Sequence, residues 1–461
     1  MNVDESLSLP PEEMRRLGYR VVDLIVDHFT SVRSKSLDGV KTRTGLEAAL
    51  REPLPEHGAD PDGPLKQLVD VVFPAILHLD HPRFFAFVPS PSNYVSVLAD
   101  ALASGFNVFA GSWLEASGPT VVELVVVDWL RELCGLPQDA GGVFVPSGSL
   151  ANLTAVILAR ERNGAEGIVY CSDQAHSSVL RAFRVLGIPA SRMRIVETDD
   201  SFRFRPAELE KTMREDAARS MRPMCVVATA GTTNTGAFDP LVPLRSICNQ
   251  YDAWLHVDGA YGAAAALSSR GREAVHGLGA ADSIALDPHK WLFQPFEAGC
   301  LLVRHPAALR EAFRILPEYL SDLEIGEINF CDYGLQLTRS FRALKVWLSL
   351  KVFGASAFRA AVDKGIELAE YAERRIREST VLELVTSAQF GIVTFRVRST
   401  TADLRAICKR LMTDGVALLS TTEIRGRSVL RMCTINPRTT PADIDQTVEA
   451  IERIATGREA R

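Results

Sequence analysis

Short apolar runs alternate with helical segments between residues 141 and 303, and this alternation is the clearest pattern in the chain. The predicted strands are the runs 142–145, 168–171, 193–196, 225–228, 254–257, 283–286 and 299–303. Helical spacing fills most of the gaps, at 151–162, 177–186, 207–219 and 244–251. Alternating strands and helices predict an α/β fold with a seven-stranded, mostly parallel sheet covered by helices on both faces.

The two ends of the chain differ from this central region. Met14, Leu17, Val21 and Leu24 follow helical spacing after two prolines, and residues 53–64 are rich in Pro and Gly, which predicts a helix followed by an extended arm. The tail predicts helices at 358–378 and 401–414 and strands at 391–395 and 429–432. We therefore expect an N-terminal dimerisation arm (1–90) with little core of its own, a large domain (91–355) and a small C-terminal α/β domain (356–461).

Composition narrows the class of protein. The 461 residues are 47% hydrophobic and 23% charged, as in a soluble globular protein, and the net charge of −6 argues against a nucleic-acid partner. The longest apolar run, 121–133, is interrupted by Glu123, Asp128 and Arg131, so no membrane span is expected. The N-terminus lacks the pattern of a secretion signal, and the eight cysteines show no CxxC pairing. These features favour a reduced, cytoplasmic enzyme with neither a zinc site nor a disulfide framework.

A lysine and an aspartate each follow a predicted buried strand. Lys290 lies in the run 287–292 (DPHKWL) after the strand 283–286, and Asp258 follows the strand 254–257. Alone, each has an ordinary explanation, a solvated side chain or a turn. Together, at the strand ends where α/β sheets bind ligands, they match the needs of pyridoxal phosphate (PLP). The amine bonds to the cofactor aldehyde, and the carboxylate keeps the pyridine nitrogen protonated so that the ring accepts electrons.

Other strand ends carry further candidates for this site. Gly148 and Ser149 follow the first strand and open a helix whose N-terminus suits a phosphate, and no Walker motif is present. Thr229 ends another strand and is expected to contact the cofactor or the substrate carboxylate, whereas Asp239 is expected to cap a helix. His176 heads a helix after the second strand, where its imidazole is placed to stack on a planar ring.

Three motifs together resemble a known family. They are the runs 170–178 (YCSDQAHSS), 256–261 (HVDGAY) and 287–291 (DPHKW), and the runs 81–86 and 128–130 extend the match. The chain resembles the group II PLP-dependent amino-acid decarboxylases from about residue 10 to about residue 456, and looks most like the aromatic-L-amino-acid decarboxylases.

The resemblance implies a fold type I homodimer with active sites at the subunit interface. It implies that Lys290 carries the cofactor, that Asp258 pairs with the pyridine nitrogen, and that His176 stacks on one ring face beside the substrate carboxylate. Ala260 packs on the opposite face. Gly148, Ser149 and His289 are then expected to lie around the phosphate.

A tyrosine motif extends the resemblance to the reaction itself. The run 330–333 (FCDY) ends in Tyr333, which in this family belongs to a mobile loop that closes over the substrate and protonates the substrate carbon after CO₂ leaves. The preceding residues 321–329 are polar and contain glycine, as a lid requires. Tyr333 is therefore the expected proton donor.

The chain also departs from the family at several positions. Asp287 stands where the animal enzymes have Asn; because a second acid repels a phosphate, we expect Asp287 to turn towards the backbone, away from the site. The segment Phe87, Val88, Pro89 and Ser90 replaces Tyr-Phe-Pro-Thr, Gly111 stands where Phe is common, and Gly354 matches enzymes that accept large aromatic side chains. Small residues at positions 88 and 111 predict a roomy pocket that favours an indole over a catechol.

The predicted activity is PLP-dependent decarboxylation of an aromatic L-amino acid, first of all tryptophan or 5-hydroxytryptophan, to the amine and CO₂. Decarboxylation of a non-aromatic amino acid and an oxidative aldehyde synthase are the alternatives, although the presence of both His176 and Tyr333 argues against the synthase. An aminotransferase normally needs an arginine clamp for the substrate carboxylate, and none can be placed. A PLP-binding scaffold without activity would require a broken set of site residues.

Overall fold

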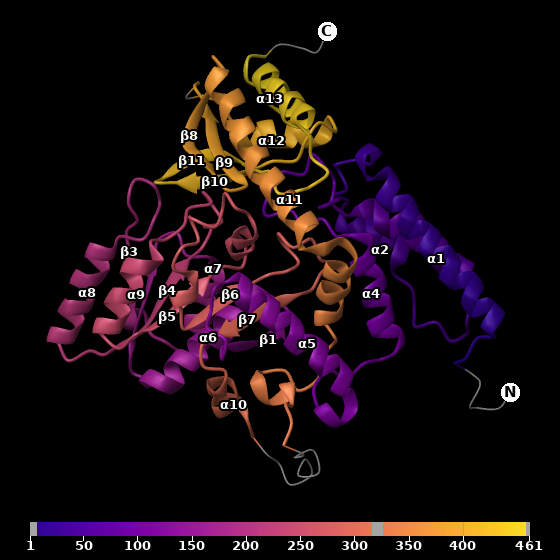
Figure 1. The fold of residues 1–461 in the computed structure, drawn as a ribbon. Helices are drawn as coiled ribbons and strands as arrows, with labels where there is room; N and C mark the ends of the chain where they lie inside the picture. The colour runs from indigo at the N-terminus through magenta and orange to yellow at the C-terminus, as the bar shows by residue number, and fades with distance from the viewer. Residues whose placement is uncertain (1–6, 316–325, 400, 458–461) are drawn as a thin grey trace.

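A central sheet of seven strands organises the large domain (Figure 1). The computed structural model describes residues 7–315, 326–399 and 401–457. The strands have the order β1-β7-β6-β5-β4-β2-β3, and only β7 runs antiparallel to its neighbours. The predicted α/β fold with a mostly parallel seven-stranded sheet is therefore confirmed.

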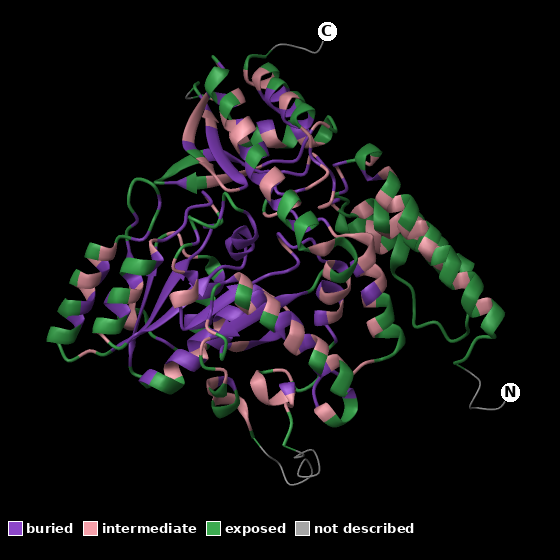
Figure 2. Ribbon diagram, viewed as in Figure 1, coloured by how far each residue is buried: buried purple, intermediate pink, exposed green. Residues whose placement is uncertain are grey.

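Every predicted strand of the large domain is present, with its bounds shifted by at most two residues. The strands are β1 (Gly141–Val145), β2 (Ile168–Ser172), β3 (Met193–Val196), β4 (Pro223–Thr229), β5 (Trp254–Asp258), β6 (Ser283–Leu286) and β7 (Gly299–Val303). The helices between and after them are α6 (Gly148–Asn163), α7 (Ser177–Val185), α8 (Pro206–Ala218), α9 (Leu241–Gln250) and α10 (Ala307–Phe313). Most strands are buried along their whole length, which explains their continuous apolar runs (Figure 2).

The small domain contains a separate four-stranded antiparallel sheet in the order β10-β11-β9-β8. Its elements are α11 (Ala343–Glu378), β8 (Leu382–Gln389), β9 (Ile392–Val397), α12 (Leu404–Thr413), β10 (Ser420–Ile424), β11 (Arg427–Cys433) and α13 (Pro441–Ala455). The strands β8 and β10 and the helix α13 were not predicted. The proposed domain boundary after residue 355 falls inside α11, next to a kink at Gly354, whose φ is +74°.

The N-terminal region is helical and has little core of its own. Its helices are α1 (Pro11–Ser31), α2 (Arg43–Leu50), α3 (Asp62–Gln67), α4 (Tyr94–Gly105) and α5 (Trp113–Leu133). No residue of α1 is buried, and the helix lies at one side of the molecule (Figures 1 and 2). The predicted extended arm is irregular up to Pro61, and α3 then begins within it at Asp62.

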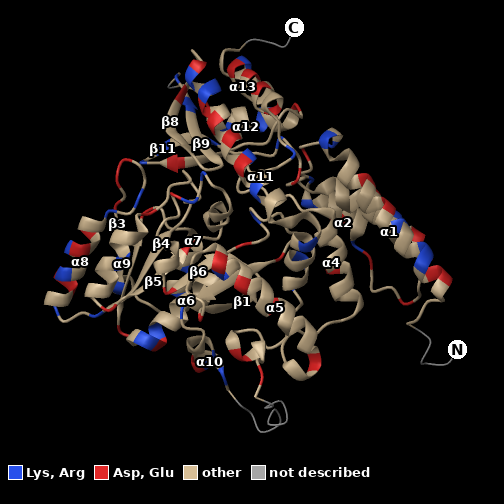
Figure 3. Ribbon diagram, in the orientation of Figure 1, with Lys and Arg blue, Asp and Glu red and all other residues tan. Residues whose placement is uncertain are grey.

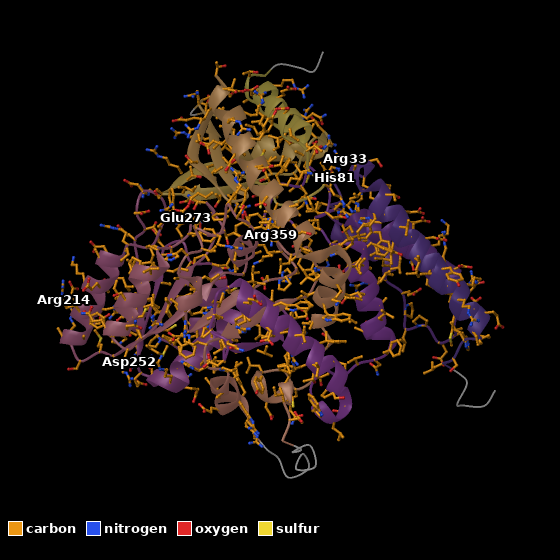
Figure 4. All side chains as sticks on the ribbon, viewed as in Figure 1. Arg33, His81, Arg214, Asp252, Glu273 and Arg359 are labelled. Carbon is orange, nitrogen blue, oxygen red and sulfur yellow. The ribbon has the colours of Figure 1, made fainter. Side chains whose placement is uncertain are left out.

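The end of this region is joined to the small domain. Phe84 forms a bridge with Leu418, and the backbone N–H of Phe85 donates to the carbonyl of Leu418. Arg33 donates to a carboxylate oxygen of Asp443 at 2.7 Å, and His81 lies close to Arg33 at the same junction (Figure 4). The N-terminal residues are therefore more than a free arm, because their last part packs within the monomer.

A buried ion pair links several segments near the first strand. Arg339 and Glu123 are almost wholly buried and lie 2.5 Å apart. The Arg339 guanidinium also donates to the carbonyls of Ala110 and Phe144 and stacks over the ring of Phe330. Burying a charged pair is favourable only when further hydrogen bonds satisfy its groups, and these contacts supply them for the guanidinium. Glu123 Oε1 accepts a further bond from the N–H of Phe144, whereas its Oε2 has no partner among the described residues.

Charged residues are distributed over the outer helices. Figure 3 shows basic and acidic residues interspersed along α1 and α8, whereas the central strands carry few of either. Within the described residues, no helix is long and apolar enough to cross a membrane. The cytoplasmic location stays a prediction.

Candidate active site

The carboxyl ends of the central strands meet at one cavity. Thr229 of β4 pairs with Asp258 of β5, and Asp258 pairs with Ala285 of β6, so the ends of these strands are aligned. Lys290 follows β6 by one tight turn, because its N–H donates to the carbonyl of Asp287. The cavity has a volume of about 260 Å³ and receives side chains from each of these strand ends.

The Lys290 ammonium is paired with Asp287. Lys290 Nζ lies 3.0 Å from Asp287 Oδ2, and the Asp287 side chain is 3% exposed. Burial disfavours the ammonium, but the carboxylates of Asp287 and Asp258 outweigh it and raise the pKa of Lys290. The expectation that Asp287 turns away to the backbone was wrong: its carboxylate faces the cavity, because it is the nearest counter-charge for the partly buried lysine.

Asp258 is held as a hydrogen-bond acceptor at both of its oxygens. Its Oδ2 accepts from Asn152 Nδ2 at 2.9 Å, and its Oδ1 accepts from the N–H of Ala260 at 3.2 Å. Asn152 belongs to α6, so the helix and the strand β5 fix the carboxylate together. These two donors fix the orientation of the Asp258 carboxylate at the cavity wall.

His176 and His289 flank the same cavity. His176 Nδ1 lies 2.7 Å from the hydroxyl of Ser178, and desolvation lowers the pKa of His176 despite the opposing charge of Asp258. His289 Nδ1 lies 2.7 Å from the carbonyl oxygen of Ala298, which leaves Nε2 towards Asp287, and burial lowers the pKa of His289. Both lowered pKa values favour neutral imidazoles at pH 7.

The polar groups around the cavity fit PLP. Ser147 precedes α6 without forming a side-chain cap, so the first backbone N–H groups of α6 are not used by a cap and can meet a phosphate. A side chain at Gly148 would come within 2.8 Å of Ala260 and 2.9 Å of Asp287, so only glycine fits there. Thr229 Oγ1 and Asp287 Oδ1 are buried and have no partner among the described residues. Such groups normally have partners. The Thr229 hydroxyl can donate to a polar ligand, whereas the Asp287 oxygen can only accept and would repel a phosphate.

Asp239 has a different role from the one expected. Its oxygens accept from the backbone N–H groups of Phe204 and Thr229, both at 2.7 Å, and no side chain caps α9. Burial raises the pKa of Asp239 to about 7, against the effect of the two N–H donors. The expectation that it caps a helix was therefore wrong, and it instead fixes the strand end that carries Thr229.

Some of the predicted site residues line the cavity of the single chain, and others do not. The predicted residues that line the cavity are Gly148, Ser149, His176, Thr229, Asp258, Ala260, His289 and Lys290. Those that do not line it in the single chain are Phe87, Val88, Pro89, Ser90, Gly111, Tyr333 and Gly354. Tyr333 ends the short helix η9 (Phe330–Tyr333) and packs on Phe330, and burial raises the pKa of its hydroxyl. Of the predicted lid, residues 321–325 lie outside the described residues.

The space expected next to Gly111 is filled. A side chain at this position would meet the ring of Phe109 at 2.5 Å and the carbonyl oxygen of Leu337 at 2.9 Å. The prediction that Gly111 leaves room for a larger substrate was therefore wrong for the single chain, because a neighbouring aromatic ring occupies that volume.

Several cavity residues were missed in the sequence. Asn152 lies one helical turn after Ser149, and Ser178 lies two residues after His176. Their spacing from these predicted site residues was the signal that could have identified them. Tyr261 also lines the cavity, stacks on Trp291 and accepts from the N–H of Gly391. Gly231 and Thr233 complete the wall, and no local pattern marked them.

Comparison with known proteins identifies the family. The model of the pyridoxal-dependent decarboxylase conserved domain matches residues 46–398. The chain belongs to the pyridoxal-dependent decarboxylase family. It is a PLP-dependent carboxy-lyase, as predicted, and the suspected resemblance is confirmed.

Individual relatives match most or nearly all of the chain. It is 47% identical to an aromatic-L-amino-acid decarboxylase of Bacillus atrophaeus over 98% of both chains. It is 32% identical to a phenylacetaldehyde synthase of Petunia hybrida, over 84% of this chain and 81% of the relative. The crystal structure of Oryza sativa TDC with PLP and tryptamine superposes with a TM-score of 0.93 at 28% identity, over 98% of this chain and 99% of the other.

The position of Asp287 generates a prediction for cofactor binding. Replacing Asp287 with Asn removes a negative charge from the α6 N-terminus where the phosphate is expected. A like charge at this range costs between about 1 and 4 kcal/mol, so Asp287→Asn should lower the Kd for PLP about tenfold or more. Titration of the cofactor-free enzyme with PLP, followed by visible absorbance, measures this change.

Borohydride reduction provides the control for that titration. The variant Lys290→Ala should bind PLP without any reducible covalent linkage, whereas Asp287→Asn should keep the linkage. A weaker Kd in Asp287→Asn would show that this carboxylate supports cofactor binding.

Proposed function

We propose that this enzyme decarboxylates an aromatic L-amino acid, with tryptophan or 5-hydroxytryptophan preferred, and releases the amine and CO₂. The observation that carries the proposal is the convergence of Lys290, Asp258 and His176 on one cavity. The aromatic substrate is supported by the 47% identity to an aromatic-L-amino-acid decarboxylase along the whole chain. Because Gly111 offers no extra room, the indole preference depends on Val88 and Gly354.

We assign a separate task to each of the cavity residues. When bound, PLP supplies a ring that withdraws electrons from the substrate α-carbon. Lys290 would provide the amine that holds the cofactor. Asp258 keeps a proton at the pyridine nitrogen, and Thr229 offers its unpaired hydroxyl to the ligand. His176 presents its imidazole to the substrate carboxylate and orients the bond that breaks.

We propose that two copies of the chain form a homodimer with the active sites between them. The apolar side chains of α1 and of the segment around α3 leave an open groove of about 810 Å³, lined among others by Leu24, Leu68 and Phe73. Tyr333, Gly111 and Gly354 do not line the cavity of their own chain. A partner chain that covers the groove and supplies Tyr333 accounts for both observations.

A substrate panel tests the aromatic assignment. We expect kcat/KM for tryptophan and 5-hydroxytryptophan to exceed that for DOPA, and to exceed those for glutamate and histidine by more than about a hundredfold, because an apolar pocket leaves charged side chains without partners. Amine formation, separated by chromatography, provides the measurement. A preference for glutamate, valine or leucine would exclude the aromatic substrate and keep the decarboxylase class.

The variant Tyr333→Phe tests the type of reaction. It retains the ring that packs on Phe330 and removes only the hydroxyl, so proton delivery should slow by about a hundredfold, the usual contribution of a general acid. Under air, the variant should therefore shift from amine towards aldehyde, ammonia and hydrogen peroxide, whereas the wild type makes little peroxide. A wild type that itself releases aldehyde and peroxide would favour the alternative activity, an aromatic aldehyde synthase.

Mixed dimers test whether Tyr333 acts across the subunit interface. In a dimer of one Lys290→Ala chain and one Tyr333→Phe chain, a site that combines Lys290 of one chain with the tyrosine of the other is intact. Random reassortment should then restore about a quarter of wild-type amine formation, since half of the dimers are mixed and each has one intact site. If Tyr333 serves its own chain, every site lacks one group and mixing restores no activity.

A further inference from the structure

A continuous chain of hydrogen bonds passes from the core to His176. The Trp254 indole N–H donates to Ser283 Oγ at 2.8 Å, and Ser283 Oγ lies 2.9 Å from His256 Nδ1. The other ring nitrogen, His256 Nε2, lies 2.9 Å from Asn152 Oδ1. Asn152 Nδ2 in turn reaches Asp258 and Ser178.

The direction of this chain is fixed from both of its ends. An indole N–H can only donate, so the hydroxyl hydrogen of Ser283 is left for His256 Nδ1. Burial lowers the pKa of His256 to about 4, so its ring is neutral and carries its single proton on Nε2. That proton is donated to the Asn152 carbonyl. Independently, a carboxylate can only accept, so Asn152 must turn its NH₂ group towards Asp258.

Ser178 transmits this orientation to His176. One hydrogen of the Asn152 NH₂ group goes to Asp258 and the other to the oxygen of Ser178, at 2.9 Å each. The Ser178 hydroxyl hydrogen is then free to point at His176 Nδ1, 2.7 Å away, and the Ser178 backbone N–H approaches the same nitrogen at 3.3 Å. With two donors facing Nδ1, the neutral ring must carry its proton on Nε2.

We propose that Asn152 and Ser178 are positioning residues that hold His176 in the Nε2–H tautomer, while the Asn152 amide also donates to Asp258. The role of His176 in catalysis rests on the proposed function, but the tautomer itself depends only on this chain's own residues. The Asn152 amide thus contacts Asp258 directly and acts on His176 through Ser178.

The tautomer determines what His176 offers to a substrate. With Nδ1 occupied, the only group left to face a ligand is an N–H donor, which suits the oxygen of a substrate carboxylate. Because the ring is neutral, it orients the carboxylate without forming an ion pair with it. A strong ion pair would stabilise the ground state and slow the loss of CO₂.

The test is nitrogen NMR of the cofactor-free enzyme labelled with ¹⁵N-histidine, with the His176 signals identified by their loss in His176→Gln. We expect the wild type to show protonated Nε2 and unprotonated Nδ1 above the pKa of the ring. Ser178→Ala removes the hydroxyl donor and should give a measurable Nδ1–H population. Ser178→Thr keeps the hydroxyl and should retain the wild-type tautomer, and Ser177→Ala, an exposed neighbour outside the hydrogen-bond chain, should do the same.

Asn152→Asp provides a second variant that acts through a different atom. The introduced carboxyl group shares one proton with Asp258, because two carboxylates 2.9 Å apart cannot both be ionised, and this leaves it no hydrogen for Ser178. It therefore accepts the Ser178 hydroxyl hydrogen, draws it away from His176 and should also populate the Nδ1–H form. In the holoenzyme, Ser178→Ala should lower kcat about two- to tenfold with little change in KM, the range for loss of one hydrogen bond, and Ser178→Thr should restore it.

Two results would overturn the proposal. One is a wild-type His176 with its proton on Nδ1; the other is an unchanged tautomer in both Ser178→Ala and Asn152→Asp. Because the NMR signals are read without cofactor or substrate, they are independent of the substrate panel. A confirmed tautomer in an enzyme that rejects aromatic amino acids would refute the proposed function alone.

Discussion

Two carboxylates and one ammonium group share a small buried space at the edge of the central sheet, and the surrounding structure depends on keeping these charges satisfied. Asp287 pairs directly with Lys290, whereas Asp258 accepts two hydrogen bonds from neutral donors. Removing Asp287, or the donors to Asp258, would leave a charged or polar group in this space without its partner, which costs free energy. The two acids therefore have different partners: Asp287 balances the charge of the lysine, and Asp258 accepts from neutral donors, which is compatible with its proposed pairing with a cationic ring nitrogen.

Much of the fold could be predicted from the sequence because the central strands are buried on both faces. Such strands appear as continuous apolar runs, and β6 and β7 were predicted with their observed bounds. The edge strand β3 was also predicted with its observed bounds, although it is only partly buried. The small domain was harder, since β10 lies at a sheet edge and contains Thr and Glu, and β8 is only partly buried. The helix α13 carried a readable signal, a capping box between Thr440 and Asp443, that was overlooked.

Residues of the candidate site also differed in how well the sequence predicted them. Residues that end a strand, such as Asp258 and Lys290, were found because their position and chemistry coincide in a local motif. The roles of Asn152 and His256 depend on contacts between residues about a hundred positions apart, which no local pattern contains. The size of the substrate pocket was predicted least well. The absence of a side chain at Gly111 indicated an open pocket, but the ring of Phe109, from the same segment, fills that volume.

Arg339 connects the turn that carries Tyr333 with the strand that leads into the cavity. Its guanidinium binds the carbonyl of Phe144 in β1, the strand that leads into the expected phosphate site at Gly148. It also binds the carbonyl of Ala110 and stacks on Phe330, the first residue of the turn that carries Tyr333. The turn that carries Tyr333 is therefore linked to β1 of its own chain, although Tyr333 does not line the cavity beyond that strand. Because Arg339 fixes Phe330, three residues before Tyr333, the position of this turn in each chain restricts which cavity the tyrosine can serve.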